Sequence, residues 1–262
     1  MHMNEVSSPL FSVVVIASRF YHLIPATIDS IKRQTNQNFE IILIETGITK
    51  HDMQIIKEYI PKIGHFGSLS DVSVTEMINE GLQCARGRYV HFLEPGDIYL
   101  SKHSMEILST HIKKSNFPQL IWCSYLDRMN RKLPEVVKTN FSKESLMTGR
   151  VPPYFLSSWY DRQLLLSMHG VQTKYQYRFG YDLMCQLFVE KKPSFLFINQ
   201  VLTDYYLKPN KAQDNYVIFK ETLMVIRKYF GFFQMLKELF FLNKIYVLKS
   251  LLYGLKKSLI KS

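Results

Sequence analysis

Along the first hundred residues, continuous apolar runs alternate with stretches in which apolar residues recur every three or four positions. The continuous runs are FSVVVIA (11–17), FEIILIE (39–45) and RYVHFL (88–93). Runs of this length without polar alternation are typical of strands buried on both faces. The stretches between them are LIPATIDSIKRQT, HDMQIIKEYIPKI and VSVTEMINEGLQCARG. Their spacing predicts amphipathic helices, the last of them ending near Gly87. Such strand–helix repeats predict an α/β fold with a mostly parallel central sheet flanked by helices and right-handed crossovers.

The second half has a less regular pattern. PQLIWCSYLD (118–127) and SFLFINQVLTDYYL (194–207) predict further strands, separated by loops rich in Tyr, Pro and Ser. A helix is expected to begin near Asp182, and the chain after Tyr216 predicts a nearly continuous helical extension. We expect that extension to be interrupted around Gly231 and again near Asn243.

Charge changes the interpretation of this helical extension. The formal net charge of the 262 residues is +11, and residues 216–262 carry nine Lys or Arg against two Glu, a net charge of +7. On a helical wheel, the lysines at 249, 256, 257 and 261 share one arc opposite a row of leucines. A basic amphipathic helix favours an anionic membrane surface as partner. The alternative is a helix docked on the protein's own core, with its lysines facing water.

Composition limits the compartment and the type of site. Hydrophobic residues make up 47% of the chain and charged residues 21%, as in a globular protein with a full core. The three cysteines, at 84, 123 and 185, are far apart and form no C-x-x-C motif, so neither disulfides nor zinc are expected. The amino terminus lacks a signal-peptide pattern and its apolar run is too short to span a bilayer. We therefore expect a cytoplasmic protein, peripheral on the inner face of the plasma membrane.

One candidate for chemistry is ARGRYVHFLEPGD (85–97), in which a predicted strand ends in two carboxylates, Glu94 and Asp97. Ligands of α/β sheets bind at the carboxyl ends of strands, so these acids are candidate site residues. The alternative is a turn whose acids merely face water.

Five motifs in residues 11–100 resemble, in order and spacing, the family 2 glycosyltransferases, inverting enzymes with the Rossmann-like GT-A fold. They are SVVVIASR, SIKRQT, EIILIETGI, EMINEGLQCARGRYVHFL and EPGD. The resemblance implies transfer of a sugar from a nucleotide-sugar donor, expected to be a UDP-sugar, to a saccharide or lipid-linked acceptor. It also implies a divalent cation, Mg²⁺ or Mn²⁺, which neutralises the departing diphosphate. Asp97 matches the final acid of the family's turn and is the implied metal ligand, while Gly96 stands where another Asp is frequent.

The same resemblance implies which residues bind the donor. Glu45 stands where the family has an acid that accepts a hydrogen bond from uracil N3–H. The other implied donor-binding residues are Ala17, Ser18, Arg19, Asp71, Glu76, Asn79 and Glu94. Thr46, Ile48 and Ser73 depart from the family pattern beside these positions.

Acceptor attack requires a general base. The segment RFGYDLMCQLF resembles the family segment that carries this base, and Asp182 is the residue matched. Asp is also a favoured helix N-cap, and this structural role stays open for Asp182. Asp161 and Asp204 are alternative bases.

The expected organisation is a GT-A domain over residues 1–215 and a basic helical tail over 216–262. Within the domain, residues 1–100 are the nucleotide-sugar half and 101–215 the acceptor half. A step of bacterial surface-polysaccharide or lipopolysaccharide assembly fits these features. A catalytically impaired nucleotide-sugar-binding protein is the main alternative. No nucleic acid is expected as partner, since no recognition motif is present. An oxidoreductase of the Rossmann type is disfavoured, because no G-x-G-x-x-G motif follows the first predicted strand.

Overall fold

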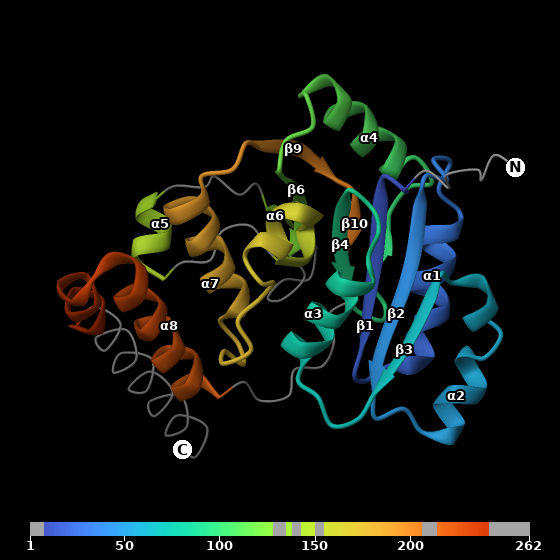
Figure 1. Cartoon of the computed structure of the whole chain (residues 1–262), viewed down its shortest axis with the longest axis horizontal. Helices are drawn as coiled ribbons and strands as arrows, with labels where there is room; N and C mark the ends of the chain where they lie inside the picture. Colours follow the sequence, from blue (N-terminus) through green and yellow to red (C-terminus); the bar gives the residue numbers. More distant parts are fainter. Residues whose placement is uncertain (1–7, 128–134, 138–142, 150–154, 206–213, 241–262) are drawn as a thin grey trace, which may run out of the picture.

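The computed structural model describes residues 8–127, 135–137, 143–149, 155–205 and 214–240. Its centre is a sheet in which neighbouring strands follow the order β3-β2-β1-β4-β8-β6-β7, with β9 paired to β6 (Figure 1). The strands of this sheet are β1 Phe11–Ala17, β2 Phe39–Thr46, β3 His65–Leu69, β4 Tyr89–Leu93, β6 Leu120–Asp127, β7 Glu135–Val137, β8 Ser158–Asp161 and β9 Phe195–Val201. The short strands β5 (Ile98–Tyr99) and β10 (Thr203–Asp204) pair with each other.

Strand direction divides the sheet into two parts. The pairs β1–β2, β1–β4 and β2–β3 are parallel, as is β6–β9. The strand β8 is antiparallel to both β4 and β6, so it joins the parallel amino-terminal half to the second half. The mostly parallel α/β sheet expected from the sequence is confirmed.

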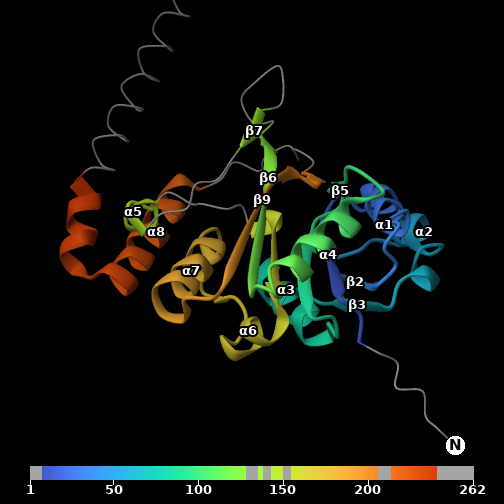
Figure 2. The same ribbon diagram turned by 90° about the horizontal axis from the view of Figure 1, so that it is seen from above.

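Helices cover both faces of the sheet (Figures 1 and 2). They are α1 Ile24–Lys32, α2 Lys50–Ile56, α3 Val74–Cys84, α4 Ser104–Lys114, α5 Lys143–Met147, α6 Arg162–Ser167, α7 Phe179–Cys185 and α8 Asn215–Phe230. Val14 and Ile16 of β1 belong to the core shared with α3, α6 and α7. Val13 and Val15 belong to the core shared with α1 and α4. Because each face of β1 contacts a helical layer, all its residues are buried, which explains the apolar run that only Ser12 interrupts.

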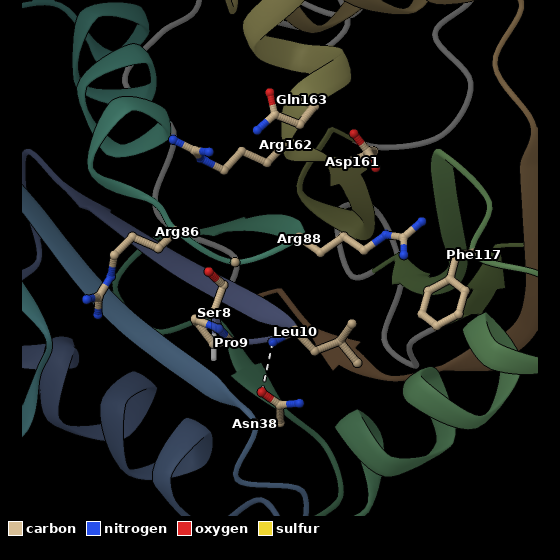
Figure 3. Close-up of a pocket in the computed structure, with 11 residues that line it drawn as sticks. Ser8, Pro9, Leu10, Asn38, Arg86, Arg88, Phe117, Asp161, Arg162 and Gln163 are labelled. Carbon is tan, nitrogen blue, oxygen red and sulfur yellow. Dashed lines mark hydrogen bonds between the residues drawn. The ribbon is translucent and has the colours of Figure 1, made fainter. Parts of the chain in front are cut away.

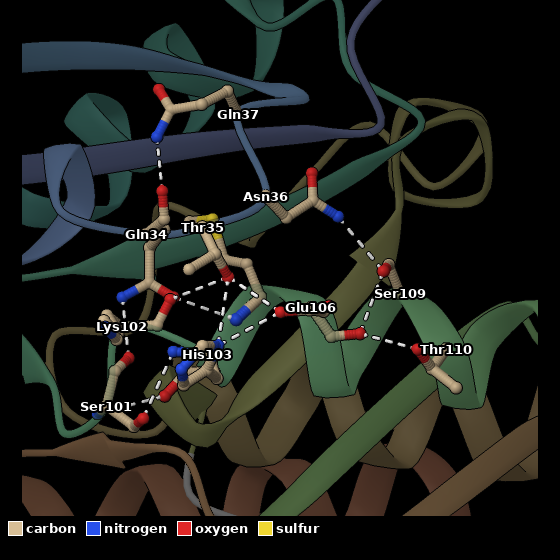
Figure 4. A network of polar contacts seen from close by, with 12 residues as sticks. Gln34, Thr35, Asn36, Gln37, Ser101, Lys102, His103, Glu106, Ser109 and Thr110 are labelled. Carbon is tan, nitrogen blue, oxygen red and sulfur yellow. Dashed lines mark hydrogen bonds and ion pairs between the residues drawn. The ribbon is translucent and has the colours of Figure 1, made fainter.

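A polar network fastens α1 to the segment that follows β5 (Figure 4). The Gln34 side chain donates to the Ser101 carbonyl at 2.8 Å and accepts from the Met105 N–H at 3.0 Å. Thr35 donates to Glu106 at 2.8 Å. These bonds fix the start of α4 against the end of α1, and β5 between them is thereby held in place.

Several expected boundaries differ from the observed ones. The strand β3 was not predicted from HFGSL, which is short and only partly buried. The helix α3 ends at Cys84, before Gly87. The helix α7 begins at Phe179 with Arg178 as N-cap, so the N-cap role considered for Asp182 is wrong.

The helical extension after Tyr216 is described as far as residue 240. The helix α8 ends at Phe230, and its C-cap residue Gly231 has a positive φ of 88°. Residues 232–240 are again helical. The interruption expected at Gly231 is therefore confirmed. The interruption near Asn243 and the lysines at 244, 249, 256, 257 and 261 lie outside the described residues. Within the described part of the chain, no helix has the length and apolar character to cross a membrane.

Candidate active site

The turn Glu94–Asp97 follows β4 at the edge of the sheet where β1 and β2 also end, because these three strands are parallel. Asp97 is only 1% exposed, and its Oδ2 accepts a hydrogen bond of 2.8 Å from the Glu94 N–H. Gly96 has a φ of 97°, a conformation that favours glycine, and its N–H donates to Thr27 Oγ1 at 2.8 Å. Asp97 therefore holds the turn closed from within.

Glu94, in contrast, lines a cleft of about 300 Å³. The cleft is lined by Ile16 and Phe92, near the ends of β1 and β4, and by Val74 and Ile78 of α3. Its remaining lining residues are Phe155–Leu156 and Tyr177–Tyr181, which are called the cleft wall below. A mostly apolar cleft with a carboxylate at a strand end is the usual form of a small-molecule site.

Glu45 is a buried carboxylate at the end of β2, next to Ala17 of β1 in the strand register. Its Oε2 accepts from the Ile48 N–H at 3.1 Å. Within the described residues, Oε1 is buried and has no hydrogen-bond partner. A buried carboxylate oxygen without a donor is energetically unfavourable, so this atom is suited to receive an N–H from a ligand.

The neighbouring Tyr21 closes the region around Glu45. Its hydroxyl donates to the Thr46 carbonyl at 2.6 Å. Burial, with a further contribution from the Glu45 charge, raises the pKa of Tyr21 to about 12. This phenol therefore stays protonated and keeps the end of β2 in position.

Ser18 and Arg19 follow Ala17 and are exposed beyond the end of β1. The Arg19 guanidinium lies over the Phe20 ring, 5.1 Å from its centroid. Both residues are thus positioned next to the Glu45 region, and their donor-binding role stays a prediction.

Asp71, Glu76 and Asn79 border this edge from the segment β3–α3. Asp71 is exposed and has a left-handed φ of 55°. Glu76 forms a capping box with Ser73, whose hydroxyl and backbone N–H donate to the carboxylate and lower the pKa of Glu76. Asn79 exchanges two hydrogen bonds, of 2.9 and 2.8 Å, with the Val171 backbone. These contacts give Glu76 and Asn79 structural roles, while their donor contacts stay predictions.

The acidic turn by itself supplies few ligands for a cation. Among the residues described, no three His, Cys, Asp or Glu side chains are grouped so that they could hold a metal ion. Of the two acids of the turn, Glu94 lines the cleft and Asp97 bonds back to the turn. Such a donor set fits a hard cation that is bound by one or two carboxylates together with phosphate oxygens.

Asp182 lies inside the protein rather than in the cleft. The cleft wall uses Tyr177 to Tyr181, whereas Asp182 is 1% exposed and its Oδ1 accepts from Lys228 Nζ of α8 at 3.0 Å. This ion pair joins α7 to α8 and compensates the charge of the buried carboxylate. The structure therefore does not bring Asp182 together with Glu94, and its role as base stays a prediction.

The alternative bases lie near opposite ends of β4, Asp161 in the central sheet and Asp204 in the two-stranded sheet of β5 and β10. Asp161 pairs in register with Tyr89, the first residue of β4, and its carboxylate caps α6 through the Leu164 N–H at 3.0 Å. It lines a different cavity together with Arg88 and Phe117 (Figure 3). Asp204 pairs in register with Ile98, directly after the acidic turn. Asp204 is thus the alternative that lies beside the candidate site.

The sequence analysis did not single out a histidine that bonds Leu156 of the cleft wall. His91, in the middle of β4, is fully buried and stacks on Trp159 with ring centroids 4.0 Å apart. One ring nitrogen bonds the Tyr99 hydroxyl and the other the Leu156 carbonyl, each at 2.7 Å. In the sequence, this histidine could have been noticed as the single polar residue within the otherwise apolar run YVHFL.

The parallel half-sheet, the cleft at its carboxyl edge and the buried Glu45 oxygen, which has no partner among the described residues, define an α/β protein with a candidate small-molecule site. The model of the family "Glycosyl transferase family 2" matches residues 12–144, so the chain belongs to this family. A PGL/p-HBAD biosynthesis glycosyltransferase of Mycobacterium bovis is 30% identical over 95 residues, which are 35% of this chain and 37% of that protein. The chain therefore matches just over a third of the length of this relative.

Two solved glycosyltransferases share the GT-A fold. TarS of Staphylococcus aureus, in complex with UDP-GlcNAc, has a TM-score of 0.65 and 13% identity, over 84% of this chain and 67% of that one. The mannosyltransferase PcManGT of Pyrobaculum calidifontis, in complex with GDP-Man and Mn²⁺, has a TM-score of 0.57 and 13% identity. This second match covers 86% of this chain and 64% of PcManGT. The fold expected from the sequence is thereby confirmed.

Proposed function

We propose that the protein transfers a sugar from a UDP-sugar to a saccharide or lipid-linked acceptor, with inversion at the anomeric carbon. The observation that carries this proposal is the buried Glu45 Oε1, which has no hydrogen-bond partner among the described residues. Uracil offers one N–H at N3, and one acceptor oxygen is what Glu45 has left after Ile48 occupies the other. The UDP-GlcNAc bound by TarS and the GDP-Man bound by PcManGT support a nucleotide-sugar as donor class.

The same geometry disfavours other bases. Guanine presents two adjacent donors, N1–H and N2–H, which pair best with both oxygens of one carboxylate. Cytosine has an acceptor at N3, which would face the carboxylate without a proton between them. A single open oxygen therefore favours UDP over GDP and CDP.

In the proposed reaction, an acceptor hydroxyl attacks the anomeric carbon as the bond to UDP breaks on the opposite face. A carboxylate takes the hydroxyl proton, and UDP leaves with the bonding electron pair. When bound, a divalent cation neutralises the diphosphate charge; Glu94 is the carboxylate on the cleft that would hold it, with Asp97 as the second candidate ligand. Asp204 beside the turn and Asp182 are the candidate bases.

The test is nucleotide binding by calorimetry with the protein and its Glu45→Gln variant. The amide has one acceptor oxygen for two N–H groups, those of Ile48 and uracil, so one group stays unpaired. UDP affinity is expected to fall about 10-fold or more, since an unsatisfied buried donor costs roughly 1–3 kcal/mol. GDP and CDP should bind the unchanged protein more weakly than UDP. Equal affinity for all three, or an unaltered UDP affinity in Glu45→Gln, would refute the role of Glu45.

Two observations favour a second candidate, a nucleotide-sugar-binding protein with impaired catalysis. Asp182 is buried against Lys228, and Gly96 replaces an acid in the turn. Incubation with a labelled UDP-sugar panel, with and without Mn²⁺, separates the two functions. Binding with neither transfer nor hydrolysis would support the impaired protein.

A further inference from the structure

The helix α8 presents a mixed aromatic and basic stripe to water. Tyr216, Lys220, Met224 and Arg227 recur at helical spacing and are all exposed. Tyr216 is 71% and Met224 42% exposed, although both are large side chains. The opposite side of α8 packs into the core through Val225 and Ile226. The exposed stripe is therefore a surface distinct from the packing side of the same helix.

The helical residues 232–240 extend this composition. Phe232, Phe233 and Phe240 are 52%, 85% and 68% exposed. Lys237, also exposed, lies one turn after Phe233 and just under one turn before Phe240. Here "outer face" denotes the exposed stripe of α8 together with Phe232, Phe233, Lys237 and Phe240. Both elements lie at the end of the molecule farthest from β3 and α2 in Figures 1 and 2.

Acidic groups of this segment point away from the outer face. Between 215 and 240 the acids are Glu221 and Glu238, which are 6% and 3% exposed. Glu221 accepts from the backbone N–H groups of residues 176–178, and Glu238 accepts from the Gln234 side chain. Asp214, just before α8, caps the start of the helix. The outer face is thus cationic as well as apolar.

We propose that the outer face docks on an anionic membrane surface. Exposed aromatic rings with interspersed Lys and Arg are the composition of segments that lie in the membrane interface. Two other occupants are disfavoured by charge. Residues 241–262 contain five lysines and no acid, so this segment would bring like charge to the outer face. A second copy would likewise oppose one cationic face to another.

The helix α8, which carries part of the outer face, is also joined to the cleft wall through its buried side. The Glu221 carboxylate holds the backbone at 176, 177 and 178 with bonds of 2.7, 2.9 and 2.9 Å, and Tyr177 and Arg178 line the cleft. A docked α8 would therefore fix the cleft relative to the bilayer. This extension rests on the proposed function: it implies that the acceptor is anchored in the same membrane rather than free in solution.

Sedimentation of the full chain with phosphatidylglycerol/phosphatidylcholine vesicles tests the docking. The variant Lys220→Ala/Arg227→Ala/Lys237→Ala removes three cations from the outer face. Its matched control, Lys57→Ala/Lys113→Ala/Lys114→Ala, removes three exposed lysines from the region of α2 and α4. At low salt the first variant is expected to bind on the order of 100-fold more weakly, at about 1 kcal/mol for each basic residue near the surface. The control should bind nearly as well as the unchanged protein.

A second variant tests the apolar component. Phe232→Ser/Phe233→Ser is expected to reduce vesicle binding several-fold at a salt concentration where the electrostatic part is screened. Thermal melting and UDP binding, measured on all variants, distinguish loss of docking from loss of folding or of the proposed donor site. Absence of binding by the full chain at low salt, or equal losses in the variant and its control, would overturn the proposal. Conversion of an oligomer to a monomer by the Phe variant, with vesicle binding unchanged, would instead assign the face to a second copy.

Discussion

At the residue scale, the two acids of the turn have different surroundings: Glu94 lines the cleft, and Asp97 accepts a hydrogen bond within the turn. The resemblance to the family assigns the metal to Asp97, whereas the structure places Glu94 on the cleft and Asp97 inside its own turn. A sequence motif aligns positions but does not show which way a carboxylate points. The hydrogen bond from the Glu94 N–H to Asp97 is a contact that only the folded turn reveals.

This difference gives a prediction for the two acids. Glu94→Gln removes the charge on the cleft and should raise the Mn²⁺ concentration for half-maximal transfer by about 10-fold or more, because even the loss of a group that orients a metal ligand typically costs about 10- to 100-fold in affinity or activity. Asp97→Asn should raise the Mn²⁺ requirement less than Glu94→Gln and also lower the melting temperature, because Asp97 accepts the Glu94 N–H within the turn. Transfer assays titrated with Mn²⁺ and thermal melting measure the two effects. A stable Asp97→Asn protein whose Mn²⁺ requirement rises more than that of Glu94→Gln would identify Asp97 as the main metal ligand.

The candidate bases can be separated in the same way. Asp204 lies beside the turn through its pairing with Ile98, so Asp204→Asn is expected to lower the transfer rate about 10²-fold with UDP affinity retained. Asp182→Asn weakens the ion pair with Lys228 and should mainly reduce the free energy of unfolding, by about 1–3 kcal/mol. Single-turnover transfer and urea denaturation distinguish the two effects. An Asp182→Asn protein of unchanged stability and lost transfer would identify Asp182 as the base.

At the element scale, the sequence was informative where burial is uniform. The strand β1 coincides with its nearly continuous apolar run, because helices on both sides bury every residue. Its one polar residue, Ser12, is buried with a hydrogen bond to Glu40 at 2.6 Å. The strands β3 and β8 have no such signature: β3 contains Gly67 and exposed residues, and β8 has four residues. Their pairing depends on partners distant in the chain. The cleft wall could not be predicted for the same reason, since Phe155 and Tyr177 reach β4 only through tertiary packing.

The contact between α8 and the cleft wall carries the next prediction. Glu221 uses both carboxylate oxygens to accept three backbone N–H groups from residues 176–178. In Glu221→Gln one oxygen becomes an NH₂ group that faces a donor, which should cost about 1–3 kcal/mol of unfolding free energy. The loosened wall should also raise KM for the acceptor more than for the donor. A matched exposed change, Glu58→Gln, should alter neither quantity.

At the scale of the whole molecule, the sheet joins two halves that meet at β4 and β8, and His91 lies at this junction. One ring nitrogen of His91 bonds the hydroxyl of Tyr99, two residues beyond the acidic turn. The other ring nitrogen bonds the carbonyl of Leu156, which belongs to the cleft wall. Tyr205 also donates to the Leu156 carbonyl, at 2.6 Å. The packing of the two halves therefore depends on a neutral imidazole that has no access to water.

Burial lowers the pKa of His91 to about 3, whereas in the unfolded chain a histidine titrates near 6.5. Between these two values the unfolded state binds a proton that the folded state does not. Stability from this group is therefore complete above pH 6.5 and falls as the pH is lowered toward 3, by at most about 1.4 kcal/mol per pH unit. Denaturation by urea at pH 7.5 and pH 4.5 should show a loss of about 2–3 kcal/mol attributable to His91.

The isolating variant is His91→Gln, whose amide can bond the same two partners without titrating. Its unfolding free energy should be lower than that of the unchanged protein at pH 7.5, because it loses the stacking on Trp159. The difference should shrink at pH 4.5, since only the unchanged protein incurs the protonation penalty. The exposed His51→Gln serves as control and should follow the unchanged protein at both pH values. A His91→Gln difference that stays constant from pH 7.5 to 4.5 would show that the imidazole is protonated in the folded state, and that the junction is open to water.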